Sequence, residues 1–233
     1  MPPVIVLPDR AALLLDLDGT LIEFAPTPDA VIIPPDLPIS LRRLRQRLGN
    51  AVAIVTGRPI AQVDALLGDA PYAVAGEHGT AIRHHPRAAI VPVALPSLPT
   101  DWAGRAQAAV AAYPGALYEP KAHGFVLHFR RAPTAGPALE AAATAILSAH
   151  PDFMLMAANM AWEVKPRAAD KGEAVRALMA QAPFAGRVPV YIGDDVTDED
   201  GMRAARALGG LGLRMQEAFG TPAAVRGWLA ASV

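Results

Sequence analysis

The chain has 233 residues, of which 52% are hydrophobic and 18% charged, and its formal net charge at pH 7 is −1. This length and apolar content predict a soluble protein with one large core, or a core and a smaller lid. Neither a basic excess nor an interleaved arginine and aromatic pattern indicates nucleic-acid binding, and no apolar stretch approaches the roughly 20 residues that span a bilayer. The absence of cysteine excludes disulfides and thiol chemistry. Met1–Asp9 lacks the features of a signal peptide, so we expect a cytoplasmic protein. We also expect a monomer.

The first informative segment is an apolar run followed by two aspartates. Ala11–Leu15 is typical of a strand buried on both faces. Asp16 and Asp18 follow two residues apart, a spacing that points both carboxylates the same way, and Gly19 permits the turn beyond them. Open α/β sheets bind ligands at such strand ends. One carboxylate there could be a nucleophile or metal ligand and the other an acid or base, unless both are simply solvated in a turn.

The next elements alternate between strand and helix. The pattern predicts helices at Leu37–Leu48 and Ile60–Leu67 and strands at Ala51–Val55 and Tyr72–Ala75. Thr56 stands at the end of the first of these strands, just before Pro59 opens a helix. Its hydroxyl and backbone N–H could therefore bind an anion, although a plain helix cap is compatible with the same position.

Between about Leu95 and Pro166 the order becomes helix, two strands, helix, two strands. The helices are predicted at Trp102–Ala112 and Ala138–Ala149, and the strands at Ala116–Glu119, Phe125–Arg130, Phe153–Met156 and Ala161–Lys165. Paired strands with short connections predict an antiparallel sheet that carries two helices, which is a separate small α/β domain. We therefore expect a core domain at 1–94 and 167–233 with an inserted cap at 95–166, which could select the substrate.

Charged and polar residues stand out among the alanine, leucine, valine and phenylalanine of the insert. They are Glu119, Lys121, His128, Arg130, Glu163 and Lys165. Strand alternation places His128 with Arg130 on one face, and Glu163 with Lys165 on one face of another strand. Acids and cations that converge on a pocket suit a polyhydroxylated ligand. The alternative is an ordinary solvated sheet face with cross-strand ion pairs.

After the insert the alternating pattern resumes and continues to a C-terminal helix at Ala223–Ala230. Lys171 precedes an amphipathic helix. The helix dipole disfavours a lysine at that position, so it has either a specific role or a plain surface location.

A second acidic cluster follows the predicted strand Val188–Ile192. It consists of Asp194, Asp195 and Asp198. If it meets Asp16 and Asp18 in one crevice, the carboxylates repel one another and require a cation. Ligands that are all oxygen favour Mg²⁺ over zinc.

Four segments in this order resemble the motifs of the haloacid dehalogenase superfamily. They are Asp16–Thr20, Thr56-Gly57-Arg58, Lys171 and Gly193–Asp198. The resemblance implies an α/β fold with a doubly wound parallel-sheet core and an inserted cap. It also implies that Asp16 attacks phosphorus and forms an aspartyl-phosphate, that Asp18 is the general acid and base, and that Thr56 and Lys171 bind phosphoryl oxygens. Asp194 would complete a Mg²⁺ site with Asp16 and the Asp18 carbonyl, supported by Asp195 and Asp198.

Further segments narrow the resemblance to the trehalose-6-phosphate phosphatases. They are Pro26–Asp29, Gly76–Gly79, Glu119-Pro120-Lys121, His128-Phe129-Arg130 and Glu163–Pro166. The similarity extends from Leu13 through Trp228 and implies a small-molecule sugar phosphate as substrate. The substrate-binding residues that it implies are Gly57, Arg58, Glu77 and His78 in the core and Lys121, Arg130 and Glu163 in the cap, with Glu119, His128 and Lys165 beside them.

Other functions fit the core motifs as well. Related capped phosphatases act on sucrose phosphate, mannosyl-3-phosphoglycerate or hexose phosphates. A sugar phosphomutase would keep the two aspartates of Asp16–Thr20 but exclude water from its phosphoenzyme. A sugar-phosphate sensor without activity typically lacks the nucleophile or the metal-binding acids, and here all of them are present.

Overall fold

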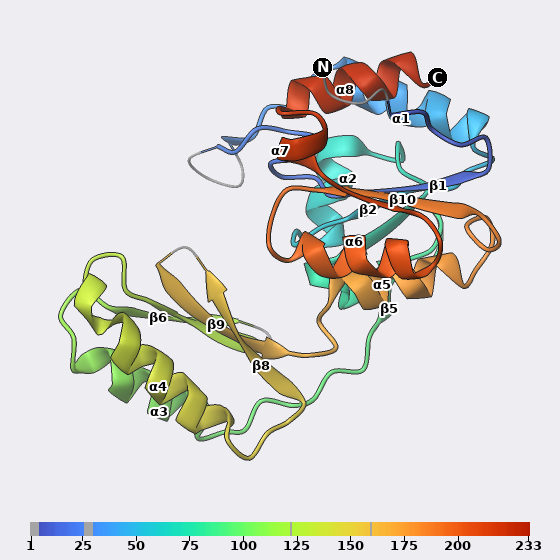
Figure 1. Cartoon of the computed structure of the whole chain (residues 1–233). Helices are drawn as coiled ribbons and strands as arrows, with labels where there is room; N and C mark the ends of the chain where they lie inside the picture. Colours follow the sequence, from blue (N-terminus) through green and yellow to red (C-terminus); the bar gives the residue numbers. More distant parts are fainter. Residues whose placement is uncertain (1–4, 26–29, 122, 159) are drawn as a thin grey trace. The chain divides into compact units, whose positions relative to one another are not determined.

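The computed structural model describes residues 5–25, 30–121, 123–158 and 160–233. The chain divides into two compact units (Figure 1). Met1–Val93 together with Asp170–Val233 form one, called here the core unit, and Ala94–Ala169 form the other, called the inserted unit. The chain therefore leaves the first unit, builds the second and returns.

A seven-stranded sheet forms the centre of the core unit, in the order β11-β10-β1-β2-β3-β4-β5. The strands are β1 (Ala11–Leu15), β2 (Val52–Val55), β3 (Ala73–Gly76), β4 (Ala81–Arg83), β5 (Val91–Pro92), β10 (Val188–Gly193) and β11 (Leu211–Arg214). Neighbours from β11 to β3 pair in parallel, whereas β4 and β5 add an antiparallel edge. The reversal of strand order between β1 and its two parallel neighbours is where such sheets bind ligands.

Strand alternation divides the core into two apolar layers. Leu13 and Leu15 of β1 belong to one layer and Ala12 and Leu14 to the other, because successive side chains point to opposite faces. The helices of the first layer are α1 (Asp36–Arg47), α2 (Ile60–Leu67) and α8 (Pro222–Ala231), and those of the second are α5 (Lys171–Met179) and α6 (Asp198–Ala207). Every residue of β1, β2 and β3 is buried, as expected for a sheet covered on both faces.

The inserted unit is an antiparallel sheet with two helices. Its strands lie in the order β6-β7-β9-β8 and are β6 (Leu117–Lys121), β7 (Gly124–His128), β8 (Phe153–Ala158) and β9 (Ala161–Pro166). The helices α3 (Trp102–Ala111) and α4 (Gly136–Leu147) cover one face through an apolar cluster that includes Trp102, Phe125 and Leu139 (Figure 1). The predicted fold class, a parallel-sheet core with a separate small α/β unit, is confirmed.

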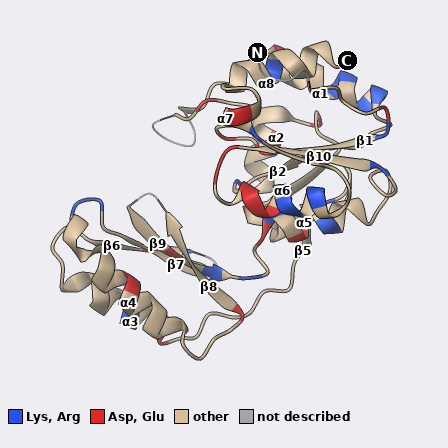
Figure 2. Ribbon diagram, viewed as in Figure 1, with Lys and Arg blue, Asp and Glu red and all other residues tan. Residues whose placement is uncertain are grey.

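Charge and helix length add two observations. Figure 2 shows acidic residues at the start of α6, whose first turn carries Asp198, Glu199 and Asp200. Acids are stabilised there by the helix dipole.

No helix in the described part of the chain has the length and apolar character that a bilayer crossing requires.

Candidate active site

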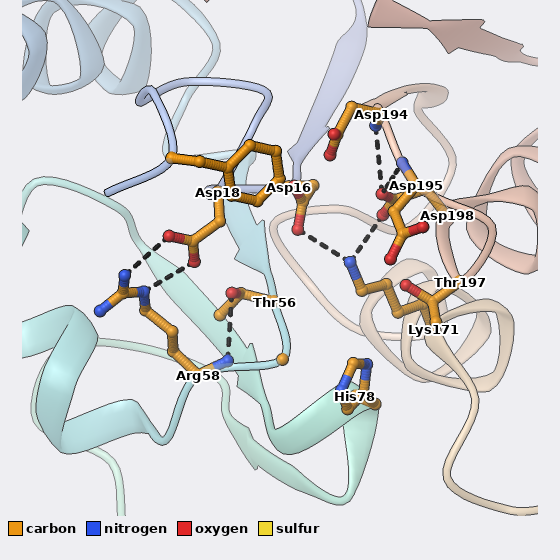
Figure 3. Close-up of a pocket in the computed structure, with 12 residues that line it drawn as sticks. Asp16, Asp18, Thr56, Arg58, His78, Lys171, Asp194, Asp195, Thr197 and Asp198 are labelled. Atoms are coloured by element: carbon orange, nitrogen blue, oxygen red, sulfur yellow. Dashed lines mark hydrogen bonds and ion pairs between the residues drawn. The ribbon is translucent and has the colours of Figure 1, made fainter. Parts of the chain in front are cut away.

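A pocket of the core unit lies where β1, β2 and β10 end (Figure 3). Its lining residues are Asp16, Asp18, Phe24, Thr56, Gly57, Arg58, His78, Lys171, Asp194, Asp195, Thr197 and Asp198. They come from five separate segments of the chain, and the parallel sheet brings these segments to one edge. The pocket therefore contains residues from all four of the motifs that suggested the superfamily.

A backbone hydrogen bond and one glycine bring the acidic segment at Asp16 close to the acidic segment at Asp194. The Asp16 N–H donates to the Ile192 carbonyl at 2.9 Å, which joins the end of β1 to the end of β10. Gly19 has a φ of +77°, and a Cβ on it would lie 2.3 Å from Asp194 Oδ2. Only glycine allows this turn to approach Asp194 so closely.

Lys171 is buried at the centre of the acidic cluster. Its Nζ donates to Asp16 Oδ1 at 2.8 Å and to Asp198 Oδ1 at 2.7 Å, and the residue is only 3% exposed. The interpretation of Lys171 as a surface residue is therefore wrong. Its two ion pairs explain why a lysine stands at a helix start that the dipole disfavours.

The cluster holds more negative charge than Lys171 compensates. Burial raises the pKa of Asp16 to about 7; Lys171 opposes this rise and Asp198 adds to it. Burial also raises the pKa of Asp194 to about 6, helped by Asp198 and Asp195. Burial by itself lowers the pKa of Lys171, but Asp16 and Asp198 outweigh it and the pKa is raised. Lys171 is thus fully charged while the acids beside it resist ionisation.

The acidic residues fit a hard divalent cation. Carboxylate oxygens of Asp16, Asp194 and Asp198 lie within 4.8 Å of one another. Their oxygen ligands and excess negative charge are what Mg²⁺ or a similar ion requires. This group of three does not include the Asp18 carboxylate, and the family resemblance implies a ligand role only for the Asp18 backbone carbonyl.

Asp198 is already saturated with hydrogen bonds. Its Oδ1 accepts from Lys171 Nζ and from the Tyr191 hydroxyl, and its Oδ2 accepts from the backbone N–H groups of Asp194 and Asp195 at 3.1 and 3.0 Å. A carboxylate has about four acceptor positions, and these four donors occupy them. Asp16 and Asp194 are therefore better placed than Asp198 to bind a metal directly.

Asp18 contacts a cation that the sequence analysis had assigned to the substrate. Arg58 Nε lies 2.6 Å from Asp18 Oδ2, and Arg58 Nη2 lies 2.7 Å from Asp18 Oδ1, so the pair is bidentate (Figure 3). The Arg58 backbone N–H also donates to Thr56 Oγ1 at 3.2 Å. Arg58 thereby connects the Thr56 turn to the Asp18 turn.

The remaining predicted core residues are divided between the pocket and its surroundings. Gly57 and His78 line it, and a Cβ on Gly57 would lie 2.8 Å from His78 Nε2, so the glycine makes room for the imidazole ring. Glu77 is exposed and does not line the pocket. Both His78 and Glu77 have positive φ values, of 57° and 51°. The segment 26–29 lies outside the described residues.

Several residues in or beside the pocket had no predicted role. Phe24 and Thr197 line the pocket, and Thr20 Oγ1 lies 3.4 Å from Asp194 Oδ1. Arg214, the last residue of β11, and Gln216, in the short helix α7 (Met215–Ala218), donate to the Asp194 carbonyl at 3.3 and 3.1 Å. Thr20 and Thr197 stand inside the first and last motifs and could have been found there, but no local pattern distinguishes Phe24, Arg214 or Gln216.

In the inserted unit three of the predicted residues form one cluster. His128 Nε2 lies 2.7 Å from Glu119 Oε2, and Lys121 forms an ion pair with Glu119. The hydrogen bond from Lys121 holds the pKa of Glu119 below its usual range, and His128 contributes. Glu119 and Glu163 both stand in register with Val126, so they share the sheet face opposite the one that packs on the helices.

The other two predicted residues of this unit are placed differently. Lys165 is buried, and its Nζ donates to the Ala169 carbonyl at 3.0 Å. β7 ends at His128, so Arg130 lies in the turn that follows the strand and is exposed. The predicted alternation of His128 and Arg130 along one strand is therefore wrong, because the antiparallel pairing stops before Arg130.

Comparisons with known proteins agree with one family. A family model described as trehalose-phosphatase matches residues 14–219. The chain is 42% identical over 208 residues to a probable trehalose-phosphate phosphatase of Sinorhizobium fredii, covering 89% of this chain and 78% of that protein. It is 37% identical over 225 residues to a trehalose-6-phosphate phosphatase of Escherichia coli, covering 96% and 83%. The solved structure of an Aspergillus fumigatus trehalose-6-phosphate phosphatase superposes with a TM-score of 0.69 at 25% identity, covering 95% of this chain and 92% of that one.

Proposed function

The chain belongs to the trehalose-phosphatase family, and from this premise we propose that it hydrolyses trehalose 6-phosphate to trehalose and inorganic phosphate. The family consists of phosphoric monoester hydrolases. The observation that carries the proposal for this chain is the buried contact between Lys171 Nζ and Asp16 Oδ1 at the end of β1. It combines a nucleophilic carboxylate with a fixed positive charge where a phosphoryl group could bind.

The reaction would proceed as two displacements on phosphorus. Asp16 attacks the phosphorus, and the sugar oxygen leaves with the electron pair of the broken bond. Asp18, protonated and released from its contact with Arg58, donates a proton to that oxygen. Asp18 then removes a proton from water, which attacks the aspartyl-phosphate, releases phosphate and restores Asp16. Lys171 and Thr56 would hold the phosphoryl oxygens, whose charge spreads in each transition state.

Asp16 and Asp194 would hold the metal ion, with the Asp18 carbonyl as a further ligand and Asp195 and Asp198 in support. We propose Mg²⁺ because all of these ligands are oxygens. When bound, the ion would neutralise charge on the phosphoryl oxygens. The raised pKa values of Asp16 and Asp194 support this assignment, since a cation relieves the repulsion that burial intensifies.

We assign recognition of the sugar to the inserted unit, as the cap domain at 95–166. Lys121, Arg130 and Glu163 would contact the disaccharide, with Glu119, His128 and Lys165 beside them. The cluster of Glu119, Lys121 and His128 supports this role, because it combines donors and acceptors on the sheet face without helices. In the core, Arg58, Gly57 and His78 would contact the phosphate end.

The experiment that tests the proposed function is phosphate release from a panel of sugar phosphates. The panel contains trehalose 6-phosphate, sucrose phosphate, mannosyl-3-phosphoglycerate and glucose 6-phosphate, each with Mg²⁺ and with excess chelator. We expect the highest kcat/KM for trehalose 6-phosphate and loss of activity with chelator. A higher value for another substrate would reassign the substrate, and full activity with chelator would contradict the metal site. The monomeric state and the cytoplasmic location stay predictions.

A further inference from the structure

Tyr191 brings a hydroxyl group into the buried end of the acidic cluster. It stands on β10, in register with Leu14 of β1 and Gly212 of β11, and it is fully buried in the second apolar layer. Its hydroxyl donates to Asp198 Oδ1 at 2.6 Å. Burial raises the pKa of the phenol well above its usual value, and Asp198 raises it further, so the group stays protonated and donates.

Two glycines make room for this contact. A Cβ on Gly201 would lie 2.5 Å from Tyr191 Cζ, and a Cβ on Gly193 would lie 2.3 Å from Asp198 Cγ. Gly201 stands inside α6, where glycine is less favourable than alanine. The ring and the carboxylate are thus both held in places that a larger neighbour would block.

Packing by itself does not require the hydroxyl. A phenylalanine would fill the same apolar layer, and a phenol buried there must find an acceptor or lose the hydrogen bond that it made with water. The acceptor here is the carboxylate that also binds Lys171 and the N–H groups of Asp194 and Asp195. Tyr191 therefore influences both Lys171 and the turn at Asp194 and Asp195, because all of them contact the Asp198 carboxylate.

We infer that Tyr191 is a positioning residue, whose hydroxyl fixes the orientation of Asp198 and through it the Lys171 ammonium and the Asp194-Asp195 turn. Without the hydroxyl, Asp198 Oδ1 has one donor fewer and competes more strongly with Asp16 for Lys171. The carboxylate is also free to rotate away from the backbone N–H groups that hold the turn. The kinetic consequence rests on the proposed function, whereas the effect on metal binding does not.

Tyr191→Phe tests the inference by removing the hydroxyl and keeping the ring. The first measurement is a Mg²⁺ titration of the thermal unfolding temperature of the full chain without substrate. We expect the Mg²⁺ concentration at the midpoint of the titration to rise up to about tenfold, because loss of an outer partner of a metal ligand costs about tenfold to a hundredfold and Tyr191 is one contact further from Asp16 and Asp194. The second is steady-state kinetics with trehalose 6-phosphate, where kcat should fall about tenfold and KM should stay within about twofold, because Tyr191 does not touch the substrate.

Tyr72→Phe is the matched control. Tyr72 packs against the same apolar layer but directly precedes β3, at the opposite end of that strand from the pocket. Removal of its hydroxyl should leave the Mg²⁺ midpoint and kcat unchanged. Equal midpoints in the Tyr191→Phe variant and the wild type overturn the inference, and so does the absence of a Mg²⁺ response in both.

Asp198→Ala removes the acceptor of the Tyr191 hydroxyl and so shows whether Tyr191 acts through Asp198. If it does, the double variant should have the Mg²⁺ midpoint of Asp198→Ala, because the second change removes no further contact with the site. Additive shifts would mean an independent role and would overturn the inference. Should the wild type not hydrolyse trehalose 6-phosphate, the proposed function fails while the metal titration still decides the role of Tyr191.

Discussion

Replacement of Lys171, the buried cation among the acidic residues, tests the electrostatic description of the site most directly. Lys171→Met keeps the aliphatic stem and removes the ammonium, so Asp16 and Asp198 lose the partner that each contacts within 2.8 Å. Removal of one partner from a buried ion pair costs about 3–5 kcal/mol, because the remaining charge is buried without compensation. We expect a loss of this size in the free energy of unfolding when the acids are ionised.

The dependence on pH follows from the raised pKa of Asp16. A folded-state pKa of about 7 lies above the unfolded value, so the stability that this group contributes is present at low pH and is lost as pH rises through about 7. Removal of Lys171 takes away the group that lowers this pKa. The loss in Lys171→Met should therefore be smaller near about pH 5, where Asp16 is protonated and only the Asp198 contact is lost, and larger near about pH 8, where Asp16 of the wild type is ionised.

Urea denaturation at both pH values, with and without excess Mg²⁺, measures the effect. Mg²⁺ should recover part of the loss, because it compensates the same acids. Lys165→Met is the matched control, since Lys165 is also buried but donates to the neutral Ala169 carbonyl. Its loss should not depend on Mg²⁺ and should differ little between the two pH values. The reasoning is refuted if Lys171→Met is equally destabilised at both pH values, or if Mg²⁺ has no effect on it.

Three further predictions concern catalysis, metal binding and recognition. Asp16→Asn should fold and bind substrate but lose several orders of magnitude in kcat, because an amide is not a nucleophile; retention of more than a few per cent of phosphate release would contradict the aspartyl-phosphate. Mg²⁺ should bind more tightly near about pH 8 than near about pH 5, since protons compete for Asp16 and Asp194, whose pKa values are about 7 and about 6; calorimetric titration measures this, and equal affinities would refute it. Lys121→Ala and Glu163→Ala should each lower kcat/KM for trehalose 6-phosphate about tenfold to a hundredfold, equivalent to about 1–3 kcal/mol of hydrogen bonding. Hydrolysis of a small aryl phosphate should hardly change, and equal losses on both substrates would assign these residues to the fold instead.

The apolar periodicity of the sequence was sufficient to predict the bounds of elements whose larger apolar residues all pack into the core. The predicted strand at Ala11–Leu15 and helix at Ile60–Leu67 have the bounds of β1 and α2. Both are apolar on the faces that the sheet or its helices cover, so local pattern and tertiary burial agree. β4 and β5 were not predicted, because such short edge strands depend on a pairing partner rather than on a pattern of their own.

The motifs also indicated which residues would come together, because parallel strands end at one edge of a sheet. Asp16, Thr56 and Asp194 each follow a predicted strand, and all three line the pocket of the core unit. That much follows from the order of strands and turns in the chain.

Only the tertiary structure decided which partner each polar group has. Arg58 pairs with Asp18, Tyr191 donates to Asp198, and Lys165 is used within its own unit. Partners of this kind stand far apart in the sequence or on different elements, and their side chains are oriented by burial and charge. A buried polar group must find a donor or acceptor wherever the fold provides one, and no local pattern specifies which.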